Sequence, residues 1–188
     1  MIENFLNEDE EKQLLKICRE KLEHSVQYSD YVPRNIPEKF FTEYGVFVTL
    51  YKNNQLRGCI GYANPTFSLI DALLHVTEAS ALQDPRFPPV SLVELEDIRI
   101  EISILTPPIE IKVDDFNDYH KNIKLGVDGL KIDYNGCSGL FLPQVPIEQD
   151  WTIDSYLDNL CLKANLPKDA WQKSDVKIYK FQTIIIQE

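Results

Sequence analysis

The sequence is poor in the residue types from which cofactor and metal sites are usually built. Its 188 residues include only seven glycines and three histidines, and they form no phosphate-binding glycine-rich loop, dinucleotide fingerprint or His-Glu-X-X-His motif. The histidines stand apart from one another, and no Cys-X-X-Cys pair occurs. The sequence therefore predicts neither a tightly bound nucleotide nor a metal centre.

Long apolar runs and clusters of basic residues are also missing. No segment approaches the roughly 20 apolar residues that cross a bilayer, and the first residues are acidic, where a signal peptide would be basic and then apolar. The net charge of −11 and the isoelectric point near 4.7 oppose electrostatic binding to a phosphate backbone. We therefore expect a cytoplasmic protein that binds neither membranes nor nucleic acid.

The four cysteines lie far apart in a chain that is large enough to fold without covalent cross-links. At 44% apolar composition it can bury one substantial core, and its length suits a single domain or two tightly joined lobes. Because disulfides are needed mainly by smaller secreted domains, we expect free thiols at Cys18, Cys59, Cys137 and Cys161.

Apolar periodicity predicts an α+β fold with mostly antiparallel sheets flanked by helices. Apolar residues recur at helical spacing in three segments, at about 8–24, 67–82 and 152–164. Alternating or β-branched runs predict strands at 46–51, 56–61, 98–105, 127–134, 137–142 and 176–186. Two strand pairs flank Asn-Asn or Asn-Gly turn signals and are expected to form hairpins. Helices and strands do not alternate regularly, which disfavours a parallel sheet.

The segment 56–61, Leu-Arg-Gly-Cys-Ile-Gly, is the part of the chain whose residues suit chemistry better than packing. In a strand, alternation places Arg57, Cys59 and Gly61 on one face. Glycine in a strand usually marks a bulge or the close approach of a backbone or ligand, so Gly58 and Gly61 would leave the thiol accessible. A neighbouring guanidinium lowers the pKa of a thiol, which makes Cys59 a candidate nucleophile. The alternative is a small buried cysteine beside an ordinary surface arginine.

A second arginine lies on a stiff loop. The proline that follows Asp84 ends the preceding helix, and two further prolines restrict the backbone that presents Arg86. If Arg57 and Arg86 converge, they form a binding spot for a carboxylate or phosphate in an otherwise acidic protein. The alternative is structural, with an Asp84–Arg86 or Arg57–Glu101 ion pair holding the lobes together.

Three other polar positions are candidates for a site. Glu101 lies on the polar face of the strand 98–105, where it lines a cleft or meets solvent. Gln144 is held between two prolines and could orient a ligand amide or bond to the backbone. His75, on the second helix, is a candidate general base together with Asp84 and Glu101, although a surface position is the default interpretation for it.

The segment 56–61 also resembles the signature of the AMMECR domain family. Further segments similar to the family are Gly45–Val48, Asp84–Pro89, Gly126–Leu130, Phe141–Val145 and the Leu160–Ala164 stretch that leads to Trp171. The likeness spans nearly the whole chain. It implies a single domain of residues 1–188 with two lobes, and it places Leu56–Gly61 near their junction. Members of this family look like components of a set of proteins that also includes Memo-type and radical-SAM proteins. The resemblance therefore implies a protein partner.

Two functions fit these features. The first is an enzyme in which Cys59 is the nucleophile, Arg57 lowers its pKa or binds the anionic group of a small substrate, and Arg86 is a second anion clamp. Its substrate-binding residues would be Gly58, Gly61, Asp84, Arg86, Glu101 and Gln144. The second is a binding or scaffold module without chemistry, in which the same cleft holds a metabolite or a loop of a Memo-type or radical-SAM partner.

Overall fold

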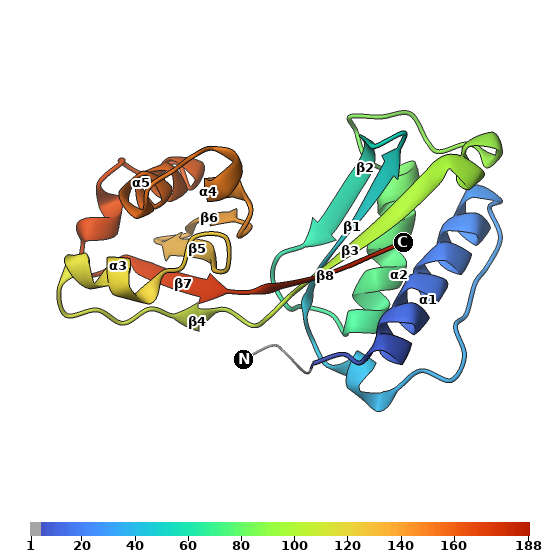
Figure 1. The fold of residues 1–188 in the computed structure, drawn as a ribbon, viewed down its shortest axis with the longest axis horizontal. Helices are drawn as coiled ribbons and strands as arrows, with labels where there is room; N and C mark the ends of the chain where they lie inside the picture. Colours follow the sequence, from blue (N-terminus) through green and yellow to red (C-terminus); the bar gives the residue numbers. More distant parts are fainter. Residues whose placement is uncertain (1–4) are drawn as a thin grey trace. The chain divides into compact units, whose positions relative to one another are not determined.

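The computed structural model describes residues 5–188 (Figure 1). The chain forms two compact units, a first unit that runs to Leu105 and also includes Ile184–Glu188, and a second unit formed by Thr106–Thr183. Each unit has a four-stranded sheet and its own hydrophobic core. Helices beside antiparallel sheets confirm the predicted α+β fold.

In the first unit, two helices pack on one face of the sheet. The strand order is β2 (Gln55–Tyr62), β1 (Gly45–Lys52), β3 (Ile98–Leu105) and β8 (Thr183–Gln187), and the helices are α1 (Glu8–Val26) and α2 (Leu69–Leu82). Alternate apolar residues of β1 and β3 join both helices in a single core, as a strand period of two requires. The other face of these strands carries Thr49 and Glu101, which lie directly opposite each other.

Local sequence signals fix the ends of these elements. Asn7 begins α1 through a capping box, because its side chain accepts a hydrogen bond from the Glu10 N–H at 3.0 Å and its own N–H donates to the Glu10 carboxylate at 2.8 Å. Asn53 and Asn54 have positive φ angles of 51° and 59°, which suit the two-residue turn between β1 and β2. The predicted helix start and hairpin turn are therefore both confirmed.

The second unit packs short helices around a smaller sheet. Its strand order is β4 (Ile109–Glu110), β7 (Lys177–Phe181), β5 (Gly129–Tyr134) and β6 (Cys137–Phe141). Its helices are α3 (Tyr119–Asn122), α4 (Val145–Glu148) and α5 (Ile153–Lys163). Short 3-10 segments occur in both units at η1 (Glu38–Phe41), η2 (Leu92–Asp97), η3 (Phe116–Asp118) and η4 (Ala170–Gln172).

The strand predicted at 176–186 is in fact two strands that belong to different sheets. Strand β7 lies in the second sheet and β8 lies in the first. At Gln182, between them, the N–H donates to the Thr106 hydroxyl at 2.9 Å and the carbonyl accepts from the Thr106 N–H at 3.0 Å. Periodicity alone could not reveal this break, because both strands are apolar and adjacent in sequence.

Candidate functional site

Strand β2 packs directly on the backbone of α2. A Cβ atom on Gly58 would lie 2.2 Å from the Ser80 carbonyl oxygen, so glycine is needed for the helix to come this close. The Ser80 hydroxyl accepts a hydrogen bond from the Ile60 N–H at 2.9 Å and donates one to the Val48 carbonyl at 2.8 Å. Of the two neighbours predicted for this glycine, a backbone or a ligand, the structure has the backbone.

The other glycine of the segment lies under an aromatic ring. Phe47 is directly opposite Gly61 in the pairing of β1 with β2, and a Cβ atom at Gly61 would lie 2.3 Å from the Phe47 ring. The space beside Gly58 and Gly61 is therefore filled by the protein's own atoms. Their assignment as substrate contacts stays a prediction.

A β-bulge changes the predicted alternation at Arg57. Leu50 pairs with Gly58, whereas Tyr51 pairs with Leu56, and this leaves Arg57 as the extra residue of β2. A bulge locally disrupts the ladder and redirects a side chain. The simple alternation that placed Arg57 and Cys59 on one face does not hold at this point of the strand.

The Arg57 side chain is directed to the segment that follows α2. Its Nε and Nη2 atoms donate to the two carboxylate oxygens of Glu94 at 3.0 and 3.1 Å, and Nη1 and Nη2 donate to the carbonyls of Pro88 and Pro89 at 2.9 and 3.3 Å. Arg57, with the Ser91 N–H, holds the pKa of Glu94 well below its usual range. Arg57 thus clamps a loop, and its ion-pair partner is Glu94 and not Glu101.

Asp84 and Arg86 form the predicted alternative ion pair, and together they bind the main chain of Cys59. The Asp84 carboxylate accepts hydrogen bonds from the Cys59 N–H at 2.8 Å and from the Arg86 main chain and guanidinium at 2.7 to 3.0 Å. Arg86 Nη2 donates to the Cys59 carbonyl at 3.0 Å. Since β2 is an edge strand, these two side chains satisfy groups that a neighbouring strand would otherwise bond.

Each member of this ion pair stabilises the charged form of the other. The Arg86 guanidinium, followed by the N–H of Cys59, holds the pKa of Asp84 far below its usual range, although burial acts in the opposite direction. The Arg86 pKa is raised, mainly by Asp84 and to a smaller extent by Cys59. Arg86 is therefore bonded to the main chain of Cys59, whereas the Arg57 guanidinium is bonded to Glu94.

The Cys59 thiol is partly buried and has a hydroxyl neighbour. Thr49 lies directly opposite Cys59 in the pairing of β1 with β2, and its Oγ1 donates a hydrogen bond to Sγ at 3.3 Å. Thr49 is also the cross-strand partner of Glu101. The thiol, the hydroxyl and the carboxylate therefore form one row across three strands, with Cys59 and Glu101 about 10 Å apart between main chains.

None of the predicted bases contacts the thiol. Asp84 is held ionised by its donors, which makes it a weak proton acceptor at neutral pH. The Nδ1 atom of His75 lies 2.8 Å from the Tyr62 hydroxyl. Glu101 lies one strand beyond Thr49 in the pairing register.

Comparison with known proteins places this arrangement in a family. The AMMECR1 family model matches residues 15–186. The chain belongs to the AMMECR1 family. It is 48% identical over 185 residues to a protein of Methanococcus aeolicus, covering 97% of this chain and 93% of that one. It is 43% identical to a protein of Methanothermobacter thermautotrophicus, covering 97% and 96%.

A solved structure shares both the fold and much of the sequence. The crystal structure of the uncharacterized protein PH0010 from Pyrococcus horikoshii superimposes with a TM-score of 0.80 at 38% identity, and the match covers 93% of this chain and 89% of that one. The AMMECR1 fold is therefore shown for both units. The expectation that Leu56–Gly61 lies near a junction of two lobes stays a prediction.

Gln144 belongs to the second unit of this AMMECR1 protein. It precedes α4, and its carbonyl accepts hydrogen bonds from the N–H groups of Ile147 and Glu148 at 3.1 and 3.0 Å. Its main chain thus starts the helical turn of α4. Its assignment as a substrate contact stays a prediction.

Sequence reasoning missed two residues that shape the AMMECR1 site. Glu94 could have been found, because Ser91-X-X-Glu94 has the spacing of a capping box, and both of its hydrogen bonds are formed. Thr49 gives no such signal, since only the strand register brings its hydroxyl to the thiol.

Within residues 5–188, no group of three or more His, Cys, Asp or Glu side chains is arranged to hold a metal ion. Every helix in the same range is too short or too polar to serve as a membrane span.

Proposed function

We propose that this AMMECR1 protein is a cysteine-dependent enzyme that acts on a small anionic substrate at the outer edge of β2. Cys59 is the nucleophile, and Arg86 binds the anionic group. The observation that carries this proposal is the position of Arg86: its Nη2 is bonded to the Cys59 carbonyl, its side chain is 52% exposed, and no hydrogen bond among residues 5–188 uses its Nη1. A guanidinium with free donors suits a carboxylate or phosphate.

The neighbouring groups support an acyl-transfer step. The Thr49 hydroxyl donates a hydrogen bond to the Cys59 sulfur, and the Arg86 guanidinium is bonded to the carbonyl of the same residue. The thiolate, after its proton passes to solvent, attacks the carbonyl carbon of an amide or ester, and the leaving group departs with a proton. Water then hydrolyses the thioester and restores the thiol. Asp84 holds Arg86 in place throughout, because four donors fix its buried carboxylate.

Alkylation by iodoacetamide at neutral pH, followed by mass spectrometry, tests this proposal. We expect Cys59 to react faster than Cys137, which is also partly buried and serves as a matched control within the same chain. Cys18 should react slowest, because burial raises its pKa to about 12. Equal or slower labelling of Cys59 would count against a nucleophilic role.

The second candidate is a non-catalytic binding or scaffold module that acts with Memo-type or radical-SAM partners. The loop that Arg57 clamps exposes Leu92 by 57% and Val93 by 86%, and exposed apolar side chains on a fixed loop suit a protein contact. In either case we propose a cytoplasmic protein, given its acidic charge and unpaired cysteines.

A Cys59→Ser variant separates the two functions. An enzyme loses turnover in this variant and keeps ligand or partner binding, since the side chain is nearly isosteric. A scaffold keeps its cellular function. Complementation of a deletion strain by the variant would therefore reject the nucleophile and favour the scaffold.

A further inference from the structure

A row of four polar residues crosses the first sheet. In order from the edge of the sheet inwards, it consists of Arg86, Cys59, Thr49 and Glu101. Arg86 Nη2 donates to the Cys59 carbonyl at 3.0 Å, and the strand pairing places Cys59 and Glu101 directly opposite Thr49 on its two sides. Residues directly opposite each other in antiparallel strands have their side chains on the same face. The thiol and the Glu101 carboxylate therefore share the face of the sheet that lies opposite to α1 and α2.

Glu101 is the charged member of this row that has no partner. Its side chain is partly buried, and no hydrogen bond or ion pair among residues 5–188 uses its carboxylate. Arg86, at the other end of the row, is paired with Asp84 at 2.7 Å. A partly buried carboxylate is stabilised by a cation that replaces the lost hydration. Glu101 is therefore suited to bind a positively charged group.

The arginine on the same strand does not supply this cation. Arg99 is two residues from Glu101 on β3, so the two side chains are on the same face. Arg99 lies over the ring of Tyr51, its cross-strand partner, with Cζ 5.1 Å from the ring centroid. No ion pair joins Arg99 to a carboxylate within the described part of the chain. The Glu101 carboxylate is thus left for a group from outside the protein.

Two aromatic side chains flank the row. Phe47 and Tyr51 lie two residues to either side of Thr49 on β1, so their side chains are on the same face as that of Thr49. Both are partly buried, whereas the shorter Thr49 is only 8% exposed. A ligand that reaches from Cys59 to Glu101 therefore packs against the exposed parts of the two rings and needs no contact with Thr49. The faces of aromatic rings also favour a cation.

We infer that Glu101 is a specificity residue of the proposed enzyme and binds a positively charged group of the substrate, such as an ammonium. This inference rests on the proposed function, in which Cys59 attacks the substrate and Arg86 binds its anionic group. Because the main chains of Cys59 and Glu101 are about 10 Å apart, the cationic group lies several bonds from the reacting carbonyl carbon. The substrate class is a small amide or ester with opposite charges on the two sides of this carbonyl. A substrate with a second anionic group in place of the cation would be repelled by Glu101.

Two matched thiol reagents test this inference on the full chain. Both are methanethiosulfonates with a five-carbon chain, which spans the distance to Glu101, and the chain ends in an ammonium in one reagent and in a hydroxyl in the other. Each forms a mixed disulfide with a thiol as methanesulfinate leaves. We expect the ammonium reagent to modify Cys59 about fivefold faster than the hydroxyl reagent at low ionic strength, and added salt to reduce this advantage. Mass spectrometry gives both rates, and Cys137 in the same chain is the reference thiol.

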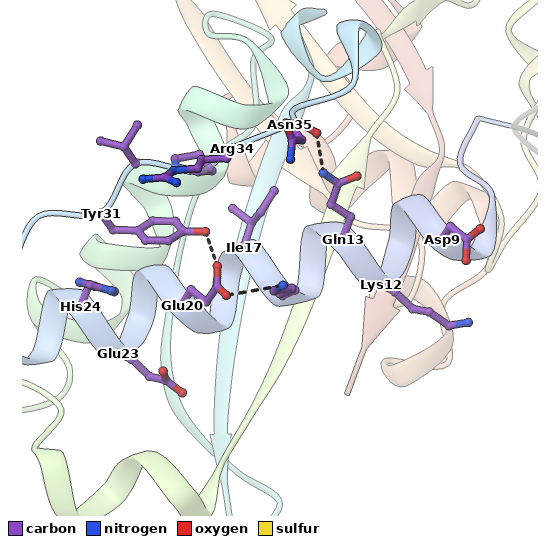
Figure 2. A pocket seen from close by; sticks show the side chains of 13 residues that line it. Asp9, Lys12, Gln13, Ile17, Glu20, Glu23, His24, Tyr31, Arg34 and Asn35 are labelled. Carbon is purple, nitrogen blue, oxygen red and sulfur yellow. Dashed lines mark hydrogen bonds and ion pairs between the residues drawn. The ribbon is translucent and has the colours of Figure 1, made fainter.

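Variants assign the preference to one carboxylate. Glu101→Gln should remove the fivefold advantage of the ammonium reagent at Cys59. Glu23→Gln is the matched control and should keep it, because Glu23 is also partly buried but lies on α1, beside the cavity that this helix forms with residues 31–35 and on the other face of the sheet (Figure 2).

The outcomes separate this inference from the proposed function. If Cys59 reacts with the hydroxyl reagent no faster than Cys137, the proposed function fails and the inference fails with it. If Cys59 reacts faster than Cys137 but the ammonium reagent has no advantage, only the inference is overturned. An advantage that persists in Glu101→Gln overturns it as well.

Discussion

Two arginines connect strand β2 to the loop that follows α2, Arg57 from the strand and Arg86 from the loop, yet they have different surroundings. Arg57 is 12% exposed, and every guanidinium nitrogen is bonded to Glu94 or to a loop carbonyl. Arg86 is 52% exposed and keeps Nη1 unused among the described residues, although its partner Asp84 is buried. The comparison shows that two arginines on one strand edge differ in burial and in the number of spare donors, and for that reason we propose a binding role for Arg86 and a structural role for Arg57.

The two carboxylate partners also differ in what they hold. Glu94 joins Arg57, Lys52 and its own helical turn at η2, so it connects pieces of loop and hairpin. Asp84 joins Arg86 to the main chain of Cys59, so it connects the loop to the strand that carries the thiol. Each can therefore be removed separately to ask which contact supports stability and which supports the site.

The largest effect is expected at Asp84. Asp84→Ala removes a buried carboxylate and leaves the Cys59 N–H and the Arg86 guanidinium without this partner, so we expect the free energy of unfolding to fall by about 3 kcal/mol. Chemical denaturation measures this loss. Asp30→Ala, which removes an exposed carboxylate from the same unit, is the control and should change stability little. A loss below about 1 kcal/mol at Asp84 would mean that the strand edge does not depend on this residue.

A smaller stability effect is expected at the Arg57 clamp. Arg57→Ala and Glu94→Gln should each destabilise the chain, and the double variant should cost less than the sum, with a coupling of about 1 to 2 kcal/mol for this nearly buried bidentate pair. Chemical denaturation of the wild type, the two single variants and the double variant measures this coupling. Additive losses would show that the loop is held by other contacts.

Acid titration compares the two carboxylates directly. The folded-state pKa values of Asp84 and Glu94 are lowered below ordinary values of about 3.9 and 4.3, so their contribution to stability is complete above these values and is lost as the pH falls through the lowered ones. We expect unfolding free energy to decrease below about pH 4, and less steeply in Asp84→Asn and Glu94→Gln. If the unfolding free energy fell equally steeply with pH in wild type and variants, the ion pairs of Asp84 and Glu94 would be contradicted.

The fold could be predicted further than the site because the fold depends on patterns that recur along the chain. The alternation of Ile98, Ile100 and Ile102, the Asn7 cap and the Asn53-Asn54 turn all act locally, and each produced the element expected. The break at Gln182 was missed because its cause is a hydrogen bond to Thr106, which is far away in sequence.

Within the site, only contacts between residues that are close in sequence could be predicted. Asp84 and Arg86 are two residues apart on a proline-restricted loop, so their pairing was one of the stated alternatives. The role of Arg57 was not predictable, because the bulge and the approach of Glu94 come from tertiary packing. The partners of the glycines were hidden for the same reason, since a sequence does not show that a helix backbone or an aromatic ring fills the space.

The smallest structural change, and the sharpest test of the comparison, is at Arg86. Arg86→Ala should slow the alkylation of Cys59 by iodoacetamide at neutral pH, because the cation bonded to the Cys59 carbonyl is lost and the Asp84 charge is left uncompensated. Arg86→Lys keeps the charge without the fork and should restore most of the rate. Arg57→Ala should leave the rate unchanged, since its guanidinium is directed to Glu94. A lower rate in Arg57→Ala and an unchanged rate in Arg86→Ala would reverse the roles assigned to the two arginines.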